Sequence, residues 1–206
     1  MARLLAAAAL AALAPVLIIV GCAILIEDGC PVLFRQKRIG KAGHTFDLVK
    51  FRSMRKQASG SSLTARGDNR VTKVGRVIRQ YKVDELPQLW NVIRGELNFV
   101  GPRPEVPQFI EMADPLWRAT LDLKPGITGL ASLIYRDEEK LLAAVREPEQ
   151  YYRQVILPDK LRLNIEYSKH RSRRSDLQLI WLTLRSSFLP QTRDAELARR
   201  VFIPGS

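Results

Sequence analysis

A run of 23 residues with no charged side chain, at positions 4–26, constrains this chain more than any other feature. Its length is nominally enough for a transmembrane helix, which needs about 20 apolar residues. Pro15 lies near the middle of the run, where it removes a backbone hydrogen bond and favours a kink. Each half then has about 11 residues, or roughly 16 Å of helix, about half the thickness of the hydrocarbon layer. These lengths suit a re-entrant hairpin that enters and leaves by one face. A spanning helix that tolerates its proline is the open alternative.

Positive charges flank the run, with Arg3 before it and Arg35, Lys37 and Arg38 after it. Because the cytoplasmic flanks of membrane segments are enriched in Lys and Arg, both ends are expected on the cytoplasmic face. A cleavable signal peptide, or a lipoprotein signal ending at Cys22, would instead remove the run and export the rest. The single Arg before the run and the length of the apolar stretch argue against both signals.

The remaining composition narrows the class of protein. A length of 206 residues suits one domain with an appended element. The 33 Lys and Arg against 21 Asp and Glu give a net charge of +12, which points to an anionic partner: nucleic acid, lipid headgroups or a phosphorylated substrate. The two cysteines provide no disulfide framework, because one of them lies inside the apolar run.

Two short β-prone runs, at 32–34 and 46–49, are separated by Lys, Arg and two glycines, and predict a β-hairpin. Residues 56–69 are polar and rich in Gly and Ser, which indicates a loop or a mobile lid.

A helix is predicted over residues 70–81, with Asp68 and Asn69 as its N-cap. Its apolar residues fall within an arc of about 120°, which predicts one buried seam. Cations recur every three residues around the remaining circumference with no acid between them, which favours an anionic neighbour over a merely solvated surface. The seam is Val71, Val74, Val77, Ile78 and Tyr81, and the cations are Arg70, Lys73, Arg76, Arg79 and Lys82.

A second helix is expected over residues 85–94, with Asp84 as N-cap and Pro87 in its first turn. Gly95 should end it, because glycine readily adopts the left-handed conformation at a helix C-terminus.

Two proline-stiffened turns, at 98–105 and 124–129, follow this helix. Residues 137–170 are expected to be helical, with breaks near Pro148 and Pro158.

A last helix, capped by Ser175 and Asp176, should continue to about Leu189. It is apolar on nearly every side, which is typical of a helix that is either buried or partly sunk in a membrane interface, with Trp181 at the level of the headgroups.

The chemistry of the chain centres on two adjacent acids, because fingerprints of the G-x-G-x-x-G, P-loop and G-x-S-x-G types are absent. As structural residues, Asp84 and Glu85 would cap a helix and complement its dipole. As functional residues, one carboxylate would attack phosphorus while the other holds Mg²⁺ that bridges a diphosphate. Arg79, Lys82 and Arg103 are the cations that would neutralise phosphate oxygens, and prolines on both sides restrict the backbone of Arg103.

Several runs at a fixed order and spacing resemble the bacterial sugar transferase family, the monotopic polyprenyl-phosphate phosphoglycosyltransferases that begin surface glycan assembly. The resemblance covers roughly residues 4–189, far more than a single short motif. The runs are FRQKRIG (34–40), FDLVKFRSM (46–54), DELPQLWNV (84–92) with GEL (95–97), VGPRPE (100–105) and KPGITG (124–129).

This resemblance implies an enzyme that moves a sugar-1-phosphate from a UDP-sugar to polyprenyl (undecaprenyl) phosphate and releases UMP. It implies that Asp84 is the nucleophile that forms a covalent phosphosugar intermediate, and that Glu85 and Asp84 bind Mg²⁺. The substrate-binding residues that it implies are Arg79, Arg103, Lys50 and Arg52.

The expected fold class is α+β, mostly α, with a re-entrant N-terminal membrane helix, a short β-hairpin and a helical catalytic domain with interfacial helices. We expect the membrane helix at 1–30, the catalytic phosphoglycosyltransferase domain at 31–190 and a C-terminal tail at 191–206. The resemblance implies the bacterial inner membrane, with the catalytic domain on the cytoplasmic face and in contact with phospholipids. The sequence leaves the oligomeric state open, a homodimer included.

Two positions depart from the family pattern. Ala14 stands where members often carry Ser before the proline, so a hydroxyl that could satisfy a freed carbonyl is missing. Residues 130–133 differ from the Trp-Gln or Ala-Gln continuation of many members, so no sugar preference is carried over.

Two other functions compete with this interpretation. A membrane-anchored basic protein could bind anionic lipid or nucleic acid, with the acidic pair merely structural, but aromatic residues make up 7% of the chain and are spread singly, which argues against nucleic acid. A membrane phosphatase or phosphodiesterase could use the same pair with water as the acceptor.

Overall fold

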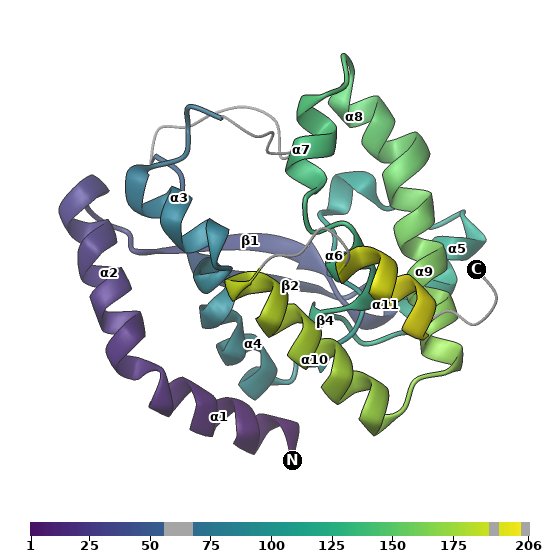
Figure 1. Cartoon of the computed structure of the whole chain (residues 1–206), viewed down its shortest axis with the longest axis horizontal. Helices are drawn as coiled ribbons and strands as arrows, with labels where there is room; N and C mark the ends of the chain where they lie inside the picture. Colours follow the sequence, from purple (N-terminus) through teal and green to yellow (C-terminus); the bar gives the residue numbers. More distant parts are fainter. Residues whose placement is uncertain (56–67, 190–193, 203–206) are drawn as a thin grey trace.

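The computed structural model describes residues 1–55, 68–189 and 194–202. It is a mostly helical α+β structure, in which a β-hairpin and a small parallel sheet lie between an N-terminal bent helix pair and the C-terminal helices (Figure 1). The expected fold class is therefore confirmed. The predicted loop at 56–69 lies almost entirely outside the described residues.

The apolar N-terminal run folds as two helices, α1 (Ala2–Ala12) and α2 (Ala14–Asp28), which are bent by 61° relative to each other. Pro15 lies in the first turn of α2, where its missing N–H leaves no helical hydrogen bond unmade. In the part of the chain that the structure describes, no single helix is long and apolar enough to cross a bilayer, whereas α1 and α2 together meet that requirement. The predicted break at Pro15 is confirmed, and the re-entrant insertion stays a prediction.

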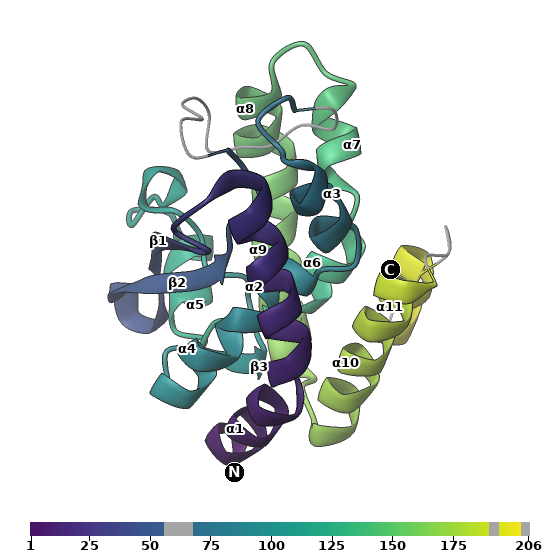
Figure 2. The same cartoon turned by 90° about the vertical axis from the view of Figure 1, so that its left-hand side faces the viewer.

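This bent pair rests on the rest of the molecule along one side and exposes the other (Figure 2). Ala6 is fully buried in a cluster with Leu48, Leu89 and Val92, and Ile24 packs in a second cluster with Phe51 and Ile78. Apolar side chains of the pair that remain exposed include Leu4, Leu5, Ile18, Ile19, Leu25 and Ile26.

The predicted hairpin is confirmed. Strands β1 (Leu33–Ile39) and β2 (Thr45–Phe51) are antiparallel, with Leu33 opposite Phe51. They are joined by a single 3-10 turn, η1 (Lys41–Gly43).

Helix α3 (Lys73–Gln80) begins three residues later than predicted. Its N-cap is Thr72, whose hydroxyl accepts a 2.8 Å hydrogen bond from the Gly75 N–H, whereas Asp68 bonds to Arg70 instead. The predicted seam is also only partly right: Ile78 is buried, but Val77 is 56% exposed and Tyr81 39% exposed.

The second predicted helix is divided into a 3-10 helix, η2 (Val83–Gln88), and α4 (Leu89–Arg94). The prediction that Asp84 is an N-cap is wrong, because Asp84 lies inside η2, whose N-cap is Lys82. Gly95 does end α4, with a left-handed backbone at φ 84°.

Each of the two predicted proline-stiffened turns, at 98–105 and 124–129, contains a short strand, β3 (Asn98–Val100) and β4 (Gly126–Thr128), and the two strands pair in parallel. Glycine allows the two backbones to touch: a Cβ atom at Gly101 would lie 2.3 Å from the Lys124 carbonyl oxygen, and one at Gly129 would lie 2.3 Å from the Gly101 carbonyl oxygen. The turn that carries Arg103 is thereby supported by the second turn. The short 3-10 helix η3 (Pro107–Phe109) and α5 (Pro115–Leu121) come between these strands in the sequence.

The C-terminal half is helical. The predicted break at Pro148 is confirmed. The one near Pro158 is wrong: a π-helical segment precedes Pro158, and the helical backbone continues from it into α9. Its elements are α6 (Leu130–Ile134), α7 (Glu138–Ala143), α8 (Pro148–Tyr151), the π-helical segment Tyr152–Ile156 and α9 (Leu157–Lys169).

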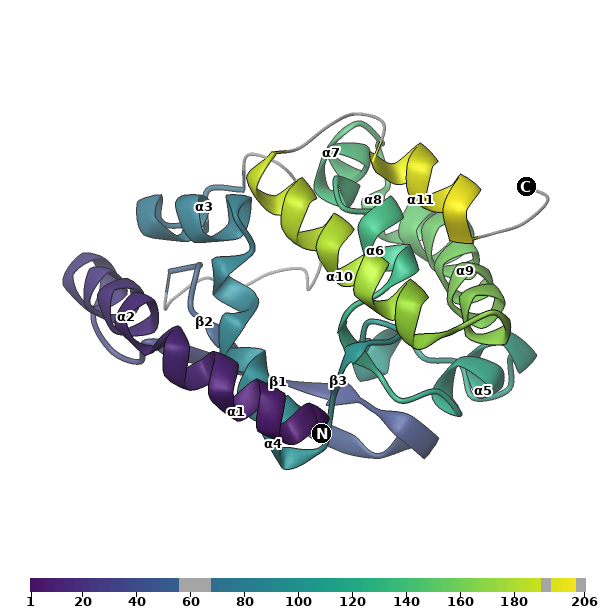
Figure 3. The same cartoon turned by 60° about the horizontal axis from the view of Figure 1, so that its bottom comes forward.

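Helices α10 (Arg173–Phe188) and α11 (Asp194–Phe202) complete the chain. The N-cap of α10 is Ser172, in a capping box with Ser175, so the predicted cap lies three residues too far along. Leu179 and Leu182 are buried with Ala198 of α11, so α10 is buried on one side only. The other side of α10 exposes Leu177, Trp181, Leu184 and Phe188. Helix α10 lies on the same side of the molecule as α1 (Figure 3).

Candidate active site

The acidic pair lies in η2, directly after α3. Between the two helices, Lys82 has a left-handed backbone at φ 57°, which lets the chain turn sharply into η2. Asp84 is 6% exposed and the Glu85 side chain is 12% exposed. Acidic side chains are almost never this buried unless they are paired, so the neighbours of the two carboxylates define the site.

Glu85 is paired with Arg103. The guanidinium donates two parallel hydrogen bonds, from Nη1 to Oε2 at 3.0 Å and from Nη2 to Oε1 at 2.9 Å. Burial alone would raise the pKa of Glu85, but the charges of Arg103, Lys82 and Lys50 outweigh it and lower the pKa to about 2. In return, the carboxylate raises the pKa of Arg103 above its ordinary value. Glu85 is therefore ionised and held in place.

Asp84 differs from its neighbour in having no such partner. Its Oδ1 atom is buried without a hydrogen bond. Burial, followed by the negative charge of Glu85, raises the pKa of Asp84 to about 6, although Lys82, Lys50 and Arg79 oppose the shift. Asp84 thus has a free oxygen and a higher basicity than an ordinary aspartate.

Lys50, near the end of β2, belongs to the same group of charges. Burial, together with repulsion from Arg103 and Arg38, lowers the pKa of Lys50 to about 8, while Asp84 and Glu85 oppose the shift. The structure therefore brings together four of the predicted residues. We call Asp84, Glu85, Lys50 and Arg103 the charged cluster.

Arg79 lies at the edge of this cluster, in the last turn of α3. A Cβ atom at Gly75 would lie 2.0 Å from the Ser53 carbonyl oxygen, so only glycine lets α3 approach the end of β2 this closely. The Arg79 guanidinium donates a long hydrogen bond of 3.5 Å to the Ser53 hydroxyl and forms an ion pair with Glu139 of α7.

Arg52 does not join the cluster. Its Nη2 atom donates to the carbonyl oxygens of Asp28, at 2.8 Å, and Gly29, at 2.6 Å, and forms a 3.1 Å ion pair with the Asp28 carboxylate. A cation at a helix C-terminus satisfies its last carbonyls and complements its dipole. In this structure Arg52 therefore fastens the end of α2 to the strand that carries Lys50.

The family model for bacterial sugar transferases matches residues 1–190. The chain belongs to the bacterial sugar transferase family. The expectation drawn from the sequence motifs is confirmed.

Two curated relatives that cover most of this chain are each 38% identical to it. The UDP-glucose:undecaprenyl-phosphate glucose-1-phosphate transferase of Caulobacter vibrioides is 38% identical over 187 residues, which cover 88% of this chain and 66% of that protein. The undecaprenyl-phosphate glucose phosphotransferase of Komagataeibacter xylinus is 38% identical over 185 residues, covering 85% of this chain and 33% of that protein. The chain thus spans between a third and two thirds of these two relatives.

In this family member, a buried layer that the sequence motifs did not reveal supports Arg103. Arg38 of β1 donates to the Pro104 carbonyl oxygen at 3.0 Å and to the Glu105 carboxylate at 3.2 Å. The Tyr152 hydroxyl donates to the other Glu105 oxygen at 2.6 Å. Arg38 and Glu105 lie within the family motifs, which was a signal for them, whereas Tyr152 stood in no motif.

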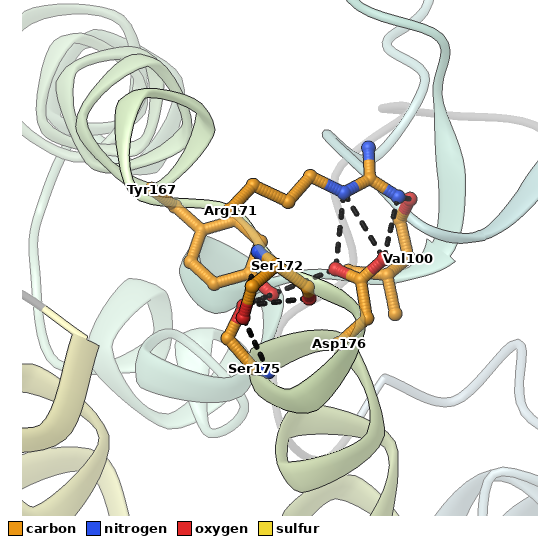
Figure 4. A network of polar contacts seen from close by, with 6 residues as sticks. All are labelled: Val100, Tyr167, Arg171, Ser172, Ser175 and Asp176. Carbon is orange, nitrogen blue, oxygen red and sulfur yellow. Dashed lines mark hydrogen bonds and ion pairs between the residues drawn. The ribbon is translucent and has the colours of Figure 1, made fainter.

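A second layer fixes the strand before this turn (Figure 4). Arg171 donates to the Val100 carbonyl oxygen at 3.0 Å and is paired with Asp176 of α10 at 2.8 Å. The Tyr167 hydroxyl donates to the same carboxylate at 2.8 Å. The start of α10 is thereby tied to the end of β3, three residues before Arg103.

The charged cluster fits a magnesium ion that shares its coordination with a substrate. Within residues 1–55, 68–189 and 194–202, no three His, Cys, Asp or Glu side chains gather as a preformed metal site. Mg²⁺, however, is usually bound through one or two carboxylates plus substrate phosphates. The unpartnered Asp84 oxygen and the adjacent Glu85 carboxylate provide such a pair.

Proposed function

We propose that the chain transfers a sugar-1-phosphate from a UDP-sugar to polyprenyl phosphate, the undecaprenyl form in bacteria, and releases UMP. The relatives from Caulobacter vibrioides and Komagataeibacter xylinus are named for transfers of this kind to undecaprenyl phosphate. The observation that supports the proposal best is the buried, unpartnered carboxylate oxygen of Asp84 beside three cations.

The proposed reaction has two displacements at one phosphorus atom. A carboxylate oxygen of Asp84 attacks the phosphorus that bears the sugar, the bond to the bridging oxygen breaks, and UMP leaves with the electron pair. A phosphate oxygen of the polyprenyl phosphate then attacks the same phosphorus, and the bond to Asp84 breaks. The covalent route divides one difficult displacement into two easier ones and returns the carboxylate unchanged.

Asp84 suits the role of nucleophile better than Glu85. Both Glu85 oxygens accept a hydrogen bond from Arg103, and a carboxylate with a pKa of about 2 is a weak base. The pKa of Asp84 is about 6, so at pH 7 it is mostly ionised and more basic than an ordinary carboxylate.

The surrounding cations would bind the donor diphosphate. Arg103 is held by its turn and by Glu85, so it loses little freedom when it meets a phosphate oxygen. The charge of Lys50 acts on the same two carboxylates, and that of Arg79 acts on Asp84. Asp84 and Glu85 would hold Mg²⁺, which when bound offsets the negative charge of the diphosphate.

The acceptor lipid cannot leave the bilayer, so the site must lie at the membrane surface. The exposed apolar sides of α1, α2 and α10 would bring it there, with Trp181 near the headgroups. We place the protein at the bacterial inner membrane, with its catalytic part on the cytoplasmic face, because cations flank the apolar run.

The direct test uses purified protein in lipid nanodiscs with Mg²⁺, undecaprenyl phosphate and a panel of UDP-sugars. UMP release and a new glycolipid are expected with at least one donor, and mass spectrometry should find a sugar-phosphate adduct on Asp84 when the acceptor is omitted. Asp84→Asn should abolish turnover and the adduct. Release of free phosphate without a glycolipid would indicate a phosphatase, and full activity of Asp84→Asn would remove the nucleophile assignment.

A further inference from the structure

The segment after the second proline-stiffened turn reaches back to the candidate active site. Helix α7 starts nine residues beyond Gly129 and carries two adjacent acids, Glu138 and Glu139. Glu138 is paired with Lys160 of α9, whereas Glu139 is paired with Arg79 of α3, 60 positions earlier in the chain. Two neighbouring carboxylates of one helix therefore bind cations of different elements.

These two contacts differ in what else holds α7 in place. Leu142 of α7 is 1% exposed and packs in an apolar cluster with Tyr152 and Ile156, and the Lys160 that pairs with Glu138 lies over the Tyr152 ring, 5.0 Å from its centre. These contacts anchor α7 to the C-terminal helices. The Glu139 side chain is 45% exposed, and an ion pair this open to solvent adds little stability. The bond between Glu139 and Arg79 can therefore break without unfolding α7.

Arg79 is the cation that a donor phosphate would need at this edge. Arg79 lies in the last turn of α3, five residues before Asp84, and its guanidinium reaches Ser53, three residues beyond Lys50. Its other described partner is a long hydrogen bond to Ser53. A carboxylate and a phosphate oxygen approach a guanidinium in the same way, so one replaces the other. Arg103 differs, because its carboxylate partner is buried and bonded twice.

Building on the proposed function, we propose that Glu139 occupies the phosphate subsite of Arg79 when no donor is bound, and that the diphosphate of the nucleotide sugar displaces it. Glu139 then competes with the donor, so it sets the affinity for the donor and not the rate of the chemical step. Donor binding would also free the Glu139 end of α7, while Leu142 and Glu138 keep the helix attached.

The test compares the full-length protein with Glu139→Gln, which removes the charge and keeps the shape. Titration calorimetry with inorganic pyrophosphate should show binding tighter by about two- to fivefold, the range that an exposed ion pair can contribute, because the competing state is lost. With an active UDP-sugar, KM should fall by a similar factor while kcat changes by less than about twofold. In an Arg79→Ala background, Glu139→Gln should no longer change pyrophosphate affinity, because the competition acts through Arg79.

Two matched variants control for the loss of one negative charge. Glu138→Gln removes the neighbouring carboxylate of α7. Glu149→Gln removes an exposed carboxylate of α8 that is paired with Arg153. Neither should tighten pyrophosphate binding. The inference is overturned if Glu139→Gln leaves the affinity unchanged or weaker, or if Glu138→Gln tightens it equally. Because pyrophosphate binding needs no turnover, a tightened affinity without any sugar-1-phosphate transfer would overturn the proposed function and leave this inference standing.

Discussion

In most proteins apolar side chains are buried and charged ones are exposed. The charged cluster and the exposed faces of α1, α2 and α10 depart from this rule in opposite ways. In the cluster, ionisable side chains are buried, with Asp84 at 6% and Glu85 at 12% exposure. On the helices, large apolar side chains face outward, with Ile26 at 86% and Leu177 at 67% exposure.

Both exceptions are unfavourable in water, and each fits a different ligand. Buried carboxylates are tolerated when cations and hydrogen bonds surround them, as Arg103 and Lys50 do here. Exposed apolar surface of this extent marks a site of contact with a membrane or another protein. Under the proposed function, one region would bind the anionic substrate and the other would contact the bilayer.

Removal of Arg103 from the charged cluster should have the largest effect, because it lowers both turnover and stability. Arg103→Ala leaves Glu85 buried without its partner, and we expect turnover to fall by about 10²–10³-fold. The free energy of unfolding should fall by about 2 kcal/mol, less than the 3–5 kcal/mol of a fully buried pair because Arg103 is 34% exposed. Turnover assays and urea denaturation measure both effects. Arg94→Ala, which removes an exposed arginine paired with Glu96, should change neither; an equal loss there would argue against a special role for Arg103.

Replacement of Asp84 should make the protein more stable while it abolishes turnover. Because burial raises the pKa of Asp84 to about 6, the folded state favours the protonated form. This contribution to stability is fully present below about pH 4 and is lost as the pH rises through 6. At pH 8, Asp84→Asn should raise the free energy of unfolding by up to about 3 kcal/mol.

Two pH profiles check this prediction. The gain in stability of Asp84→Asn should shrink toward pH 4, where the native aspartate is protonated too. The kcat/KM of the unaltered protein should rise with pH as Asp84 loses its proton, because attack needs the carboxylate, and with Mg²⁺ bound beside Asp84 the midpoint should lie below 6. A variant that is less stable than the parent protein at pH 8 would contradict the assignment of a raised pKa.

A moderate effect is expected from the layer that supports Arg103. Tyr152→Phe removes the hydrogen bond to Glu105 and leaves a buried carboxylate oxygen without it, which should cost about 1–2 kcal/mol of stability. If this layer positions Arg103, kcat should fall about tenfold with little change in KM. Tyr151→Phe is the matched control. A loss of stability with an unchanged kcat would reduce Tyr152 to a structural residue.

The smallest effect should come from the apolar side of the comparison. Trp181→Ala reduces the exposed apolar surface of α10. It should weaken binding to lipid vesicles by about fivefold, as expected for partial insertion of one aromatic side chain. Gln178→Ala, on the same helix, is the control. Vesicle sedimentation measures both, and equal binding of the Trp181 variant and the parent protein would show that α10 stays clear of the membrane.

Local patterns were sufficient for several parts of the fold. The break at Pro15, the hairpin and the end of α4 at Gly95 follow from proline, β-branched and glycine chemistry within a few residues. The start of α3 was missed because the Thr72 hydroxyl accepts the capping hydrogen bond from the Gly75 N–H, while the Asp68 carboxylate pairs with Arg70. Asp84 was mistaken for a cap because adjacent acids at a helix start carry the same signal whether or not they are buried.

For the site, the sequence by itself determined the acidic pair, the two stiff turns and the family to which they belong. The tertiary structure alone decided which cations meet the pair, because side chains distant in the chain become neighbours only after β2, η2 and the turn at Arg103 pack together. In the folded chain Arg52 binds the end of α2 and Arg79 pairs with Glu139. The partner of each of these arginines is more than 20 residues away in the sequence, so a local pattern could not reveal it. The tertiary structure also made two adjacent carboxylates unlike each other, because one meets a guanidinium and the other is left with a buried, unpaired oxygen.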